Sequence, residues 1–227
     1  FYTMKDEPNA MSLAWGLDGK LYAGSSKNGK VFRFDENGKP YVLCQFKGSE
    51  IRSILAKDNG LYIGVNKTET GGKASFVRTV EDSKSDPEDG SLKDLMQGQV
   101  YFVSSNGITK ELFKVESAFI IDLATAPKGI YAATGDGGKV YQIIEAGDYR
   151  TVFDLPEKEV MTLAQTAKQL LAGTSGFGKL YSLGGDVKDG RTYTSHAIDG
   201  GSISWWGRLY TKGVDVKQRI RVGNTEE

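Results

Sequence analysis

Apolar and polar residues alternate in short runs along the chain, and glycine-containing turns separate the runs. The clearest run recurs four times, at residues 21–24, 61–64, 130–133 and 170–173. The four copies begin 40, 69 and 40 residues apart, so the odd spacing is one period plus 29 residues. Alternation with a period of two is typical of β-strands that bury one face. The pattern therefore predicts an all-β fold built from internal repeats.

Each repeat contains four such runs. Small apolar residues form the first (12–14, 54–56, 122–124 and 162–164), and the recurring run is the second. The third lies at 30–32, 99–101, 139–141 and 179–181, and the fourth at 41–46, 110–115, 150–155 and 191–197. Turn pairs such as Asp18-Gly19 and Asn28-Gly29 supply the positive φ that two-residue hairpins need. Four hairpin-linked strands per repeat predict the blades of a β-propeller. A solenoid, the competing repeat fold, usually has shorter repeats without such hairpins.

The repeats also predict how the blades are arranged. We expect the alanine-containing first strand of each blade nearest the central axis, where small side chains fit, with the Tyr and Phe residues of the second and third strands between neighbouring sheets. Residues 1–200 then hold four blades, with an insertion at about 68–97 in the second repeat. Residues 201–227 are either the closing strands of a last blade or the start of a truncated β-sandwich.

Two closures of the ring fit the repeat pattern. Residues 1–11 align with residues 151–161, which begin on the outermost strand of a blade, and Ser204 lies one period after Ala164. A five-bladed ring would take residues 1–4 as the fourth strand of its last blade. Alternatively, the chain is a piece of a larger ring with a partial fifth blade.

Composition and charge exclude several classes of function. Lys and Arg total 29 and Asp and Glu total 29, so no net field attracts nucleic acid. The sequence contains no run of about 18 apolar residues, so it predicts no membrane-spanning helix. Cys44 and His196 are the single cysteine and histidine of this sequence, which excludes an internal disulfide, a thiolate-rich zinc site and a multi-histidine metal site. We therefore expect a non-enzymatic protein without catalytic, metal-binding or cofactor-binding residues. Cys44 should be a half-buried apolar residue on an outermost strand.

Two segments are candidate partner-binding surfaces. The second half of the insertion is acidic, through Glu81, Asp82, Asp86, Glu88 and Asp89, and could hold a basic partner or bind calcium weakly. Its charge-rich, proline-containing composition is also typical of a solvated loop, and its carboxylates do not match the spacing of an EF-hand. The other segment contains Trp205, Trp206 and Arg208. Its indoles could stack on a partner or a sugar ring, or cap the junction after the last blade.

Carbohydrate chemistry is a further alternative for a propeller. A glycosidase needs two carboxylates that face each other across a pocket. Four residues ahead of the repeated leucines, the sequence alignment places Asn9, Ile51, Phe119 and Glu159, and one position earlier it places Pro8, Glu50, Ala118 and Lys158. No acidic set recurs at either position. The glycine-rich runs 134–138 and 173–178 lack the context of a phosphate loop or a nucleophile elbow and are expected to be hairpin turns.

The repeats and the C-terminal segment together resemble a known group of proteins. The runs LYAGS, IYAATGDGGKVYQI and LLAGTSGFGKLYSL, followed by Trp206-Gly207-Arg208-Leu209 and then by Arg221, Gly223, Asn224 and Thr225, resemble bacterial WD-repeat-like propellers of unassigned role. In those proteins the last segment opens a β-sandwich. The resemblance implies that this chain, which begins at Phe1 and not at Met, is part of a longer envelope or secreted protein. It implies an extracytoplasmic location and no catalytic residues.

These observations predict a binding or scaffold module that presents the loop face of a propeller to a protein partner. Function on a propeller depends on its loops, because the fold itself hosts many unrelated activities. A carbohydrate-binding or carbohydrate-active propeller is the alternative, and a purely architectural blade set is a third hypothesis.

Overall fold

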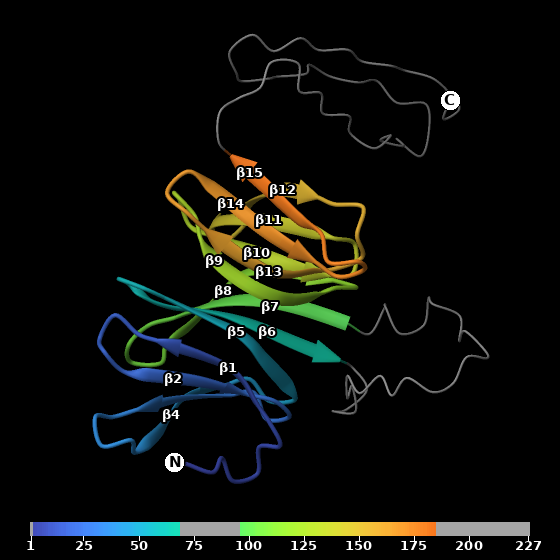
Figure 1. Cartoon of the computed structure of the whole chain (residues 1–227). Coiled ribbons are helices and arrows are strands. Elements are labelled where there is room, and N and C mark those ends of the chain that lie inside the picture. The colour runs from blue at the N-terminus through green and yellow to red at the C-terminus, as the bar shows by residue number, and fades with distance from the viewer. Residues whose placement is uncertain (1, 69–95, 185–227) are drawn as a thin grey trace, which may run out of the picture. The chain divides into compact units, whose positions relative to one another are not determined.

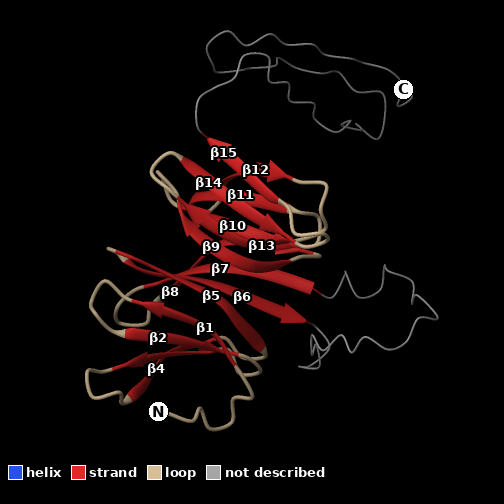
Figure 2. Cartoon of the chain, in the orientation of Figure 1, coloured by secondary structure: helices blue, strands red, loops and turns tan. Residues whose placement is uncertain are grey.

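The computed structural model describes residues 2–68 and 96–184. All regular structure in these two ranges is β, as Figures 1 and 2 show. No helix that could cross a membrane occurs among them. The prediction of an all-β fold is confirmed.

The strands form four antiparallel sheets in chain order. The first sheet contains β1 (Ala10–Trp15), β2 (Leu21–Ser25), β3 (Lys30–Phe34) and β4 (Pro40–Gln45). The second contains β5 (Ser49–Lys57), β6 (Gly60–Thr68), β7 (Met96–Val103) and β8 (Thr109–Glu116). The third contains β9 (Phe119–Thr125), β10 (Ile130–Gly135), β11 (Lys139–Glu145) and β12 (Asp148–Asp154). The fourth contains β13 (Val160–Gln165), β14 (Gln169–Thr174) and β15 (Leu180–Gly184), and its expected fourth strand at 191–197 lies outside the described residues.

Consecutive sheets meet through their first strands. β1 contacts β5, β5 contacts β9, and β9 contacts β13. One apolar cluster lies between each pair of consecutive sheets, and the equivalent tyrosines Tyr22, Tyr62 and Tyr131 each belong to one of them. Aromatic pairs such as Phe46 with Tyr101 bridge the same interfaces. Hairpin-linked sheets that meet at their first strands and pack through aromatic residues are propeller blades, so the predicted fold is confirmed.

Small residues on the second strands allow neighbouring sheets to approach closely. A Cβ on Gly24 would lie 2.5 Å from Cγ2 of Ile51, and one on Gly64 would lie 2.9 Å from Cγ2 of Ile120. In the third sheet the equivalent position is Ala133, and the residue equivalent to the two isoleucines is the smaller Val160. Glycine therefore faces isoleucine and alanine faces valine, so the summed side-chain volume at this contact varies little.

Asp122 links the first strands of three sheets. One carboxylate oxygen accepts hydrogen bonds from the Leu123 amide (2.8 Å) and the Ser53 hydroxyl (3.3 Å). The other accepts from the Leu163 amide (2.8 Å) and the Thr162 hydroxyl (3.2 Å). These bonds reach from β9 to β5 on one side and to β13 on the other.

The strand pairing corrects the sequence alignment in the second repeat. The fourth residue of each recurring run is small, and each pairs with one residue of the first strand. The pairs are Gly24 with Ser12, Gly64 with Ser53, Ala133 with Asp122, and Gly173 with Thr162. The run equivalent to 12–14 is therefore 53–55, and not 54–56 as the sequence suggested. Ala14 and Ala56 look alike in sequence, but Leu55 is the residue that pairs with Tyr62 as Ala14 pairs with Tyr22.

Cys44 lies on β4, the outermost strand of the first sheet, and is half-buried, as predicted. Burial raises the pKa of its thiol to about 12. The thiol is therefore protonated at neutral pH and is a poor nucleophile.

Candidate functional site

The first strand of every sheet contains a β-bulge at the same position. Strand pairing skips Met11 in β1, Arg52 in β5, Ile121 in β9 and Met161 in β13. A bulge leaves one residue outside the ladder and redirects its side chain, and bulges are common next to functional sites. The sequence analysis did not detect these bulges, because an unpaired residue leaves only a local irregularity in the alternation.

Three of the four bulges border one cavity. It has a volume of about 220 Å³ and lies where the first strands of the second, third and fourth sheets begin and the second strands end. Its lining residues are Glu50, Arg52, Asn66, Met96, Phe119, Ile121, Gly135, Asp136, Lys158, Glu159 and Met161. We call it the bulge cavity.

Equivalent positions in the bulge cavity carry unlike side chains. Two residues before the bulge stand Glu50, Phe119 and Glu159, and at the bulge itself stand an arginine, an isoleucine and a methionine. The backbone has the same strand pairing at these positions in each sheet, so the fold does not require the side chains there to differ. Variation in chemistry on a repeated frame is what a specific binding site requires.

Backbone contacts hold the walls of the cavity in place. The Asn66 side-chain amide donates to the Ile120 carbonyl (2.8 Å), and the Ile120 amide donates to the Asn66 side-chain oxygen (2.8 Å). This buried pair of bonds joins β6 to β9. The backbone of Glu159 bridges to Gly135 and accepts a hydrogen bond from the Ser175 amide (3.0 Å). These bonds fix the β6–β9 wall of the cavity and hold Glu159 through its main chain, so its carboxylate is not used in them.

Five charged side chains line the cavity. Glu50, Asp136 and Glu159 are acidic, whereas Arg52 and Lys158 are basic. Burial raises the pKa of Glu50, and the nearby positive charge of Arg52 opposes that rise. The other lining residues carry no charge: Asn66, Met96, Phe119, Ile121, Gly135 and Met161.

The register error in the second repeat explains why the sequence analysis missed this site. It aligned Ile51 with Phe119 and Glu159, whereas the residue equivalent to them is Glu50. The correct register puts two glutamates, Glu50 and Glu159, at one repeated position. Asp136 was interpreted as part of a hairpin turn, and it does lie in the turn after β10, with a positive φ of 66°. That turn also borders the cavity.

The residues predicted to bind a partner lie outside the described ranges. This applies to Glu81, Asp82, Asp86, Glu88 and Asp89 of the insertion and to Trp205, Trp206 and Arg208. The structure does locate the two ends of the insertion. Thr68 pairs with Met96, and Met96 lines the bulge cavity. The insertion therefore joins the described chain beside the cavity.

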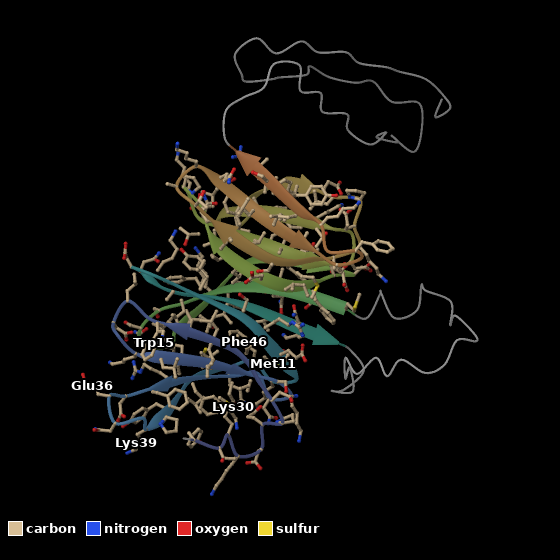
Figure 3. All side chains as sticks on the ribbon, viewed as in Figure 1. Met11, Trp15, Lys30, Glu36, Lys39 and Phe46 are labelled. Atoms are coloured by element: carbon tan, nitrogen blue, oxygen red, sulfur yellow. The ribbon has the colours of Figure 1, made fainter. Side chains whose placement is uncertain are left out.

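A second hollow lies in the first sheet, at the end of β1 that is opposite to its bulge. This open groove of about 440 Å³ runs between the turns 16–20 and 35–39, and its lining includes Trp15, Phe34, Asp35 and Glu36. In Figure 3, Trp15 and Glu36 lie towards one end of the first sheet and Met11 lies towards the other. Trp15 is 71% exposed. Its equivalent in β5, Ala56, packs on the first sheet, so Trp15 faces the side of the first sheet that has no neighbouring sheet in the described chain.

Comparisons with known proteins show the fold and no specific function. No protein-family model matches the chain, and no curated protein matches its sequence. Among solved structures, the PQQ-bound aldose sugar dehydrogenase from Streptomyces coelicolor is similar with a TM-score of 0.53 and 14% identity, over 78% of this chain and 61% of that chain. The computationally designed Ika4 protein has a TM-score of 0.48 and 17% identity, over 80% of this chain and 95% of that one. The Pan2 WD40 domain of Neurospora crassa has a TM-score of 0.38 and 14% identity, over 76% and 61%.

Propeller folds occur among these neighbours, which include an enzyme as well as a WD40 domain. The similarity to the aldose sugar dehydrogenase, the one of these three with a TM-score above 0.5, supports the class of fold, a β-propeller, and leaves function to the site itself.

Proposed function

We propose that this chain is a non-enzymatic binding module that presents the face around the bulge cavity to a protein partner. The observation that carries the proposal is the cavity itself, which places unlike charged and apolar side chains at repeated positions of three sheets. The attachment of the insertion beside Met96 supports the same face, because loops on one face of a rigid scaffold commonly hold binding residues.

The size of the cavity favours a protein partner over a free metabolite. Pockets for small molecules usually have volumes of about 300 to 1,000 Å³. At about 220 Å³ the bulge cavity is smaller, and it suits one inserted side chain. Protein interfaces depend on such anchors, which fill central pockets surrounded by polar groups.

The experiment compares two methionines that occupy the same bulge position. Met161→Trp fills the bulge cavity, whereas Met11→Trp alters a bulge that does not line it. A partner recovered by crosslinking to the full chain is identified by mass spectrometry, purified, and titrated by calorimetry. We expect Met161→Trp to weaken binding by at least about tenfold, the loss of a central anchor, with Met11→Trp close to wild type. Equal affinities of the two variants would contradict the proposal.

A carbohydrate ligand is the second candidate, and the exposed Trp15 favours it. An indole beside Asp35 and Glu36 combines a stacking surface with hydroxyl acceptors, and the groove of about 440 Å³ is large enough for a sugar unit. A glycan array with wild type and Trp15→Ala separates the two candidates. Glycan binding that Trp15→Ala abolishes would support this second function.

We also propose that the chain belongs with the bacterial WD-repeat-like propellers and works outside the cytoplasm, within a larger envelope or secreted protein. The support is the segment from Trp206 to Leu209 with Arg221, Gly223, Asn224 and Thr225. Fractionation of the source cells, with an antibody against residues 2–68, would locate the native protein and give its size.

A further inference from the structure

We propose that the bulge cavity accepts a basic side chain, Arg or Lys, of the partner, with its charged head between Glu50 and Glu159 and its stem along Phe119 and Met161. This inference rests on the proposed function and names the chemistry of the anchor.

The two carboxylates are available for a cation. In residues 2–68 and 96–184, neither Glu50 nor Glu159 accepts a side-chain hydrogen bond or forms an ion pair, although Arg52 lies close enough to Glu50 to influence its charge. Both glutamates occupy the position two residues before a bulge, on β5 and immediately before β13. A half-buried carboxylate without donors has lost part of its hydration, and a charged donor would restore that loss.

The remaining lining suits the stem of a basic side chain. Phe119, Ile121, Met96 and Met161 provide apolar surface around the carboxylates. Arg and Lys bury their methylene groups on apolar surface and keep their charged heads on polar groups. Methionine adapts its shape to such stems, which explains the use of two methionines in a small cavity.

The two glutamates select a cation over an anion. Glu50 and Glu159 are half-buried acids of the lining, and an inserted cation would lie beside both of them. An inserted carboxylate would lie near the same two acids. Like charges in a confined site repel strongly, so an acidic anchor is disfavoured.

Methionine methyl groups report on the cavity directly. The chain has four methionines, of which Met96 and Met161 line the cavity whereas Met4 and Met11 do not. We would label all four with ¹³C at the methyl carbon and titrate the full chain with blocked amino acids. The probes are the N-acetyl amides of arginine, lysine, norleucine and glutamate, together with methyl glucoside.

We expect the arginine and lysine probes to shift the Met96 and Met161 signals saturably and to leave Met4 and Met11 unchanged. Norleucine, which has the stem without the charge, should bind at least about fivefold more weakly, because the charge-assisted hydrogen bonds are missing. The double variant Glu50→Gln, Glu159→Gln should lose that preference. Glu145→Gln, at an exposed acid of β11 that lines neither hollow, is the matched control and should keep it.

Three results would overturn this inference: equal shifts with norleucine, preferential shifts with glutamate or methyl glucoside, or no shift of Met96 and Met161 with any probe. None of them bears on partner capture, because the comparison of Met161→Trp with Met11→Trp uses the identified partner. A loss of capture with Met161→Trp and no cation preference would leave the binding face intact and reject only the basic anchor.

Discussion

At the scale of single residues, a buried glutamate that precedes the first strand of a sheet contacts residues at the start of the third strand of the same sheet. The Glu7 side chain is 0% exposed, lies 3.1 Å from Lys30 Nζ, and accepts a hydrogen bond from the Asn28 side-chain amide at 2.9 Å. Glu157 pairs with Lys179 in the same way in the fourth sheet, at 2.6 Å. Burial of Glu7 by itself would raise its pKa, but the hydrogen bonds from Asn28 and Lys30 outweigh it, so the pKa lies below its ordinary value.

Glu7→Gln should therefore destabilise the protein in a pH-dependent way. The lowered pKa means that ionised Glu7 stabilises the folded state above the ordinary glutamate pKa, and that this contribution is lost as the pH falls through the folded-state value. We expect a loss of about 1–3 kcal/mol at pH 7, because a charged hydrogen-bonded group is removed. Urea unfolding at pH 7 and pH 3 measures the difference, which should shrink at pH 3. Glu36→Gln, at an exposed acid, is the control, and an equal loss at both pH values would contradict the assignment.

At the scale of strands, the contact between sheets depends on matched pairs of small and large residues. Gly24 faces Ile51 across the first interface, and Ala133 and Val160 occupy the equivalent positions of the third. The repeat alignment identified the small residues of the second strands correctly. It did not identify their partners, because these belong to the next repeat and only the packing of sheets brings them together.

The variant Gly24→Ala should destabilise the protein, and Ile51→Val should not rescue it. The added Cβ would lie 2.5 Å from Ile51 Cγ2 and from Ser12 Oγ, so we expect Gly24→Ala to cost about 1–3 kcal/mol of unfolding free energy by overpacking. Ile51→Val alone should cost about 0.5–1.5 kcal/mol. Valine keeps the Cβ and Cγ2 atoms that the new methyl group meets and lacks only Cδ1, so the double variant should be no more stable than the sum of the two losses predicts. Urea unfolding of the four proteins measures this coupling.

The control is Gly173→Ala, at the equivalent position of the fourth sheet. There the only atom of the described chain within 4 Å of a new Cβ is Thr162 Cγ2. This change should cost less than Gly24→Ala. A double variant clearly more stable than the sum of the two losses predicts would contradict the packing argument.

At the scale of the whole molecule, the described sheets leave two blade faces without a neighbour among the described residues. Leu13 is 67% exposed, whereas Ile54, Leu123 and Leu163 at the same position are buried. Leu180 is 71% exposed, whereas Val31, Val100 and Val140 are completely buried. The face of the first sheet that carries Leu13 and the face of the fourth sheet that carries Leu180 thus have the residues of a sheet interface. A partial fifth blade fits this pattern.

Each described sheet is held by its own pairing and by its neighbours, so the insertion should not be needed for folding. The pairing of β6 with β7 continues to Thr68 and Met96, which brings the two ends of the insertion together. Replacing residues 69–95 with Asn-Gly should leave the fold intact and raise the free energy of unfolding by about 2 kcal/mol, because each halving of loop length lowers the cost of loop closure by about 0.6 kcal/mol. Circular dichroism and urea unfolding check this. A loss of the β signal, or a destabilisation, would show that the insertion supports the sheets.

The sequence by itself determined the class of fold, the order of strands and the position of the insertion. Alternation with a period of two and hairpin turns such as Asp18-Gly19 are local signals, and a local signal repeated every 40 residues identifies a blade. Cys44 could be placed on an outermost strand for the same reason.

Only the tertiary structure decided which side chains share the bulge cavity. Glu50 and Glu159 are 109 positions apart in the chain, and the bulges that expose Arg52, Ile121 and Met161 leave no motif in the sequence. A shift of one residue in the second repeat was enough to hide the two glutamates. Strand identity follows from neighbours along the chain, whereas a site between sheets follows from register and packing, which residues far apart in sequence determine together.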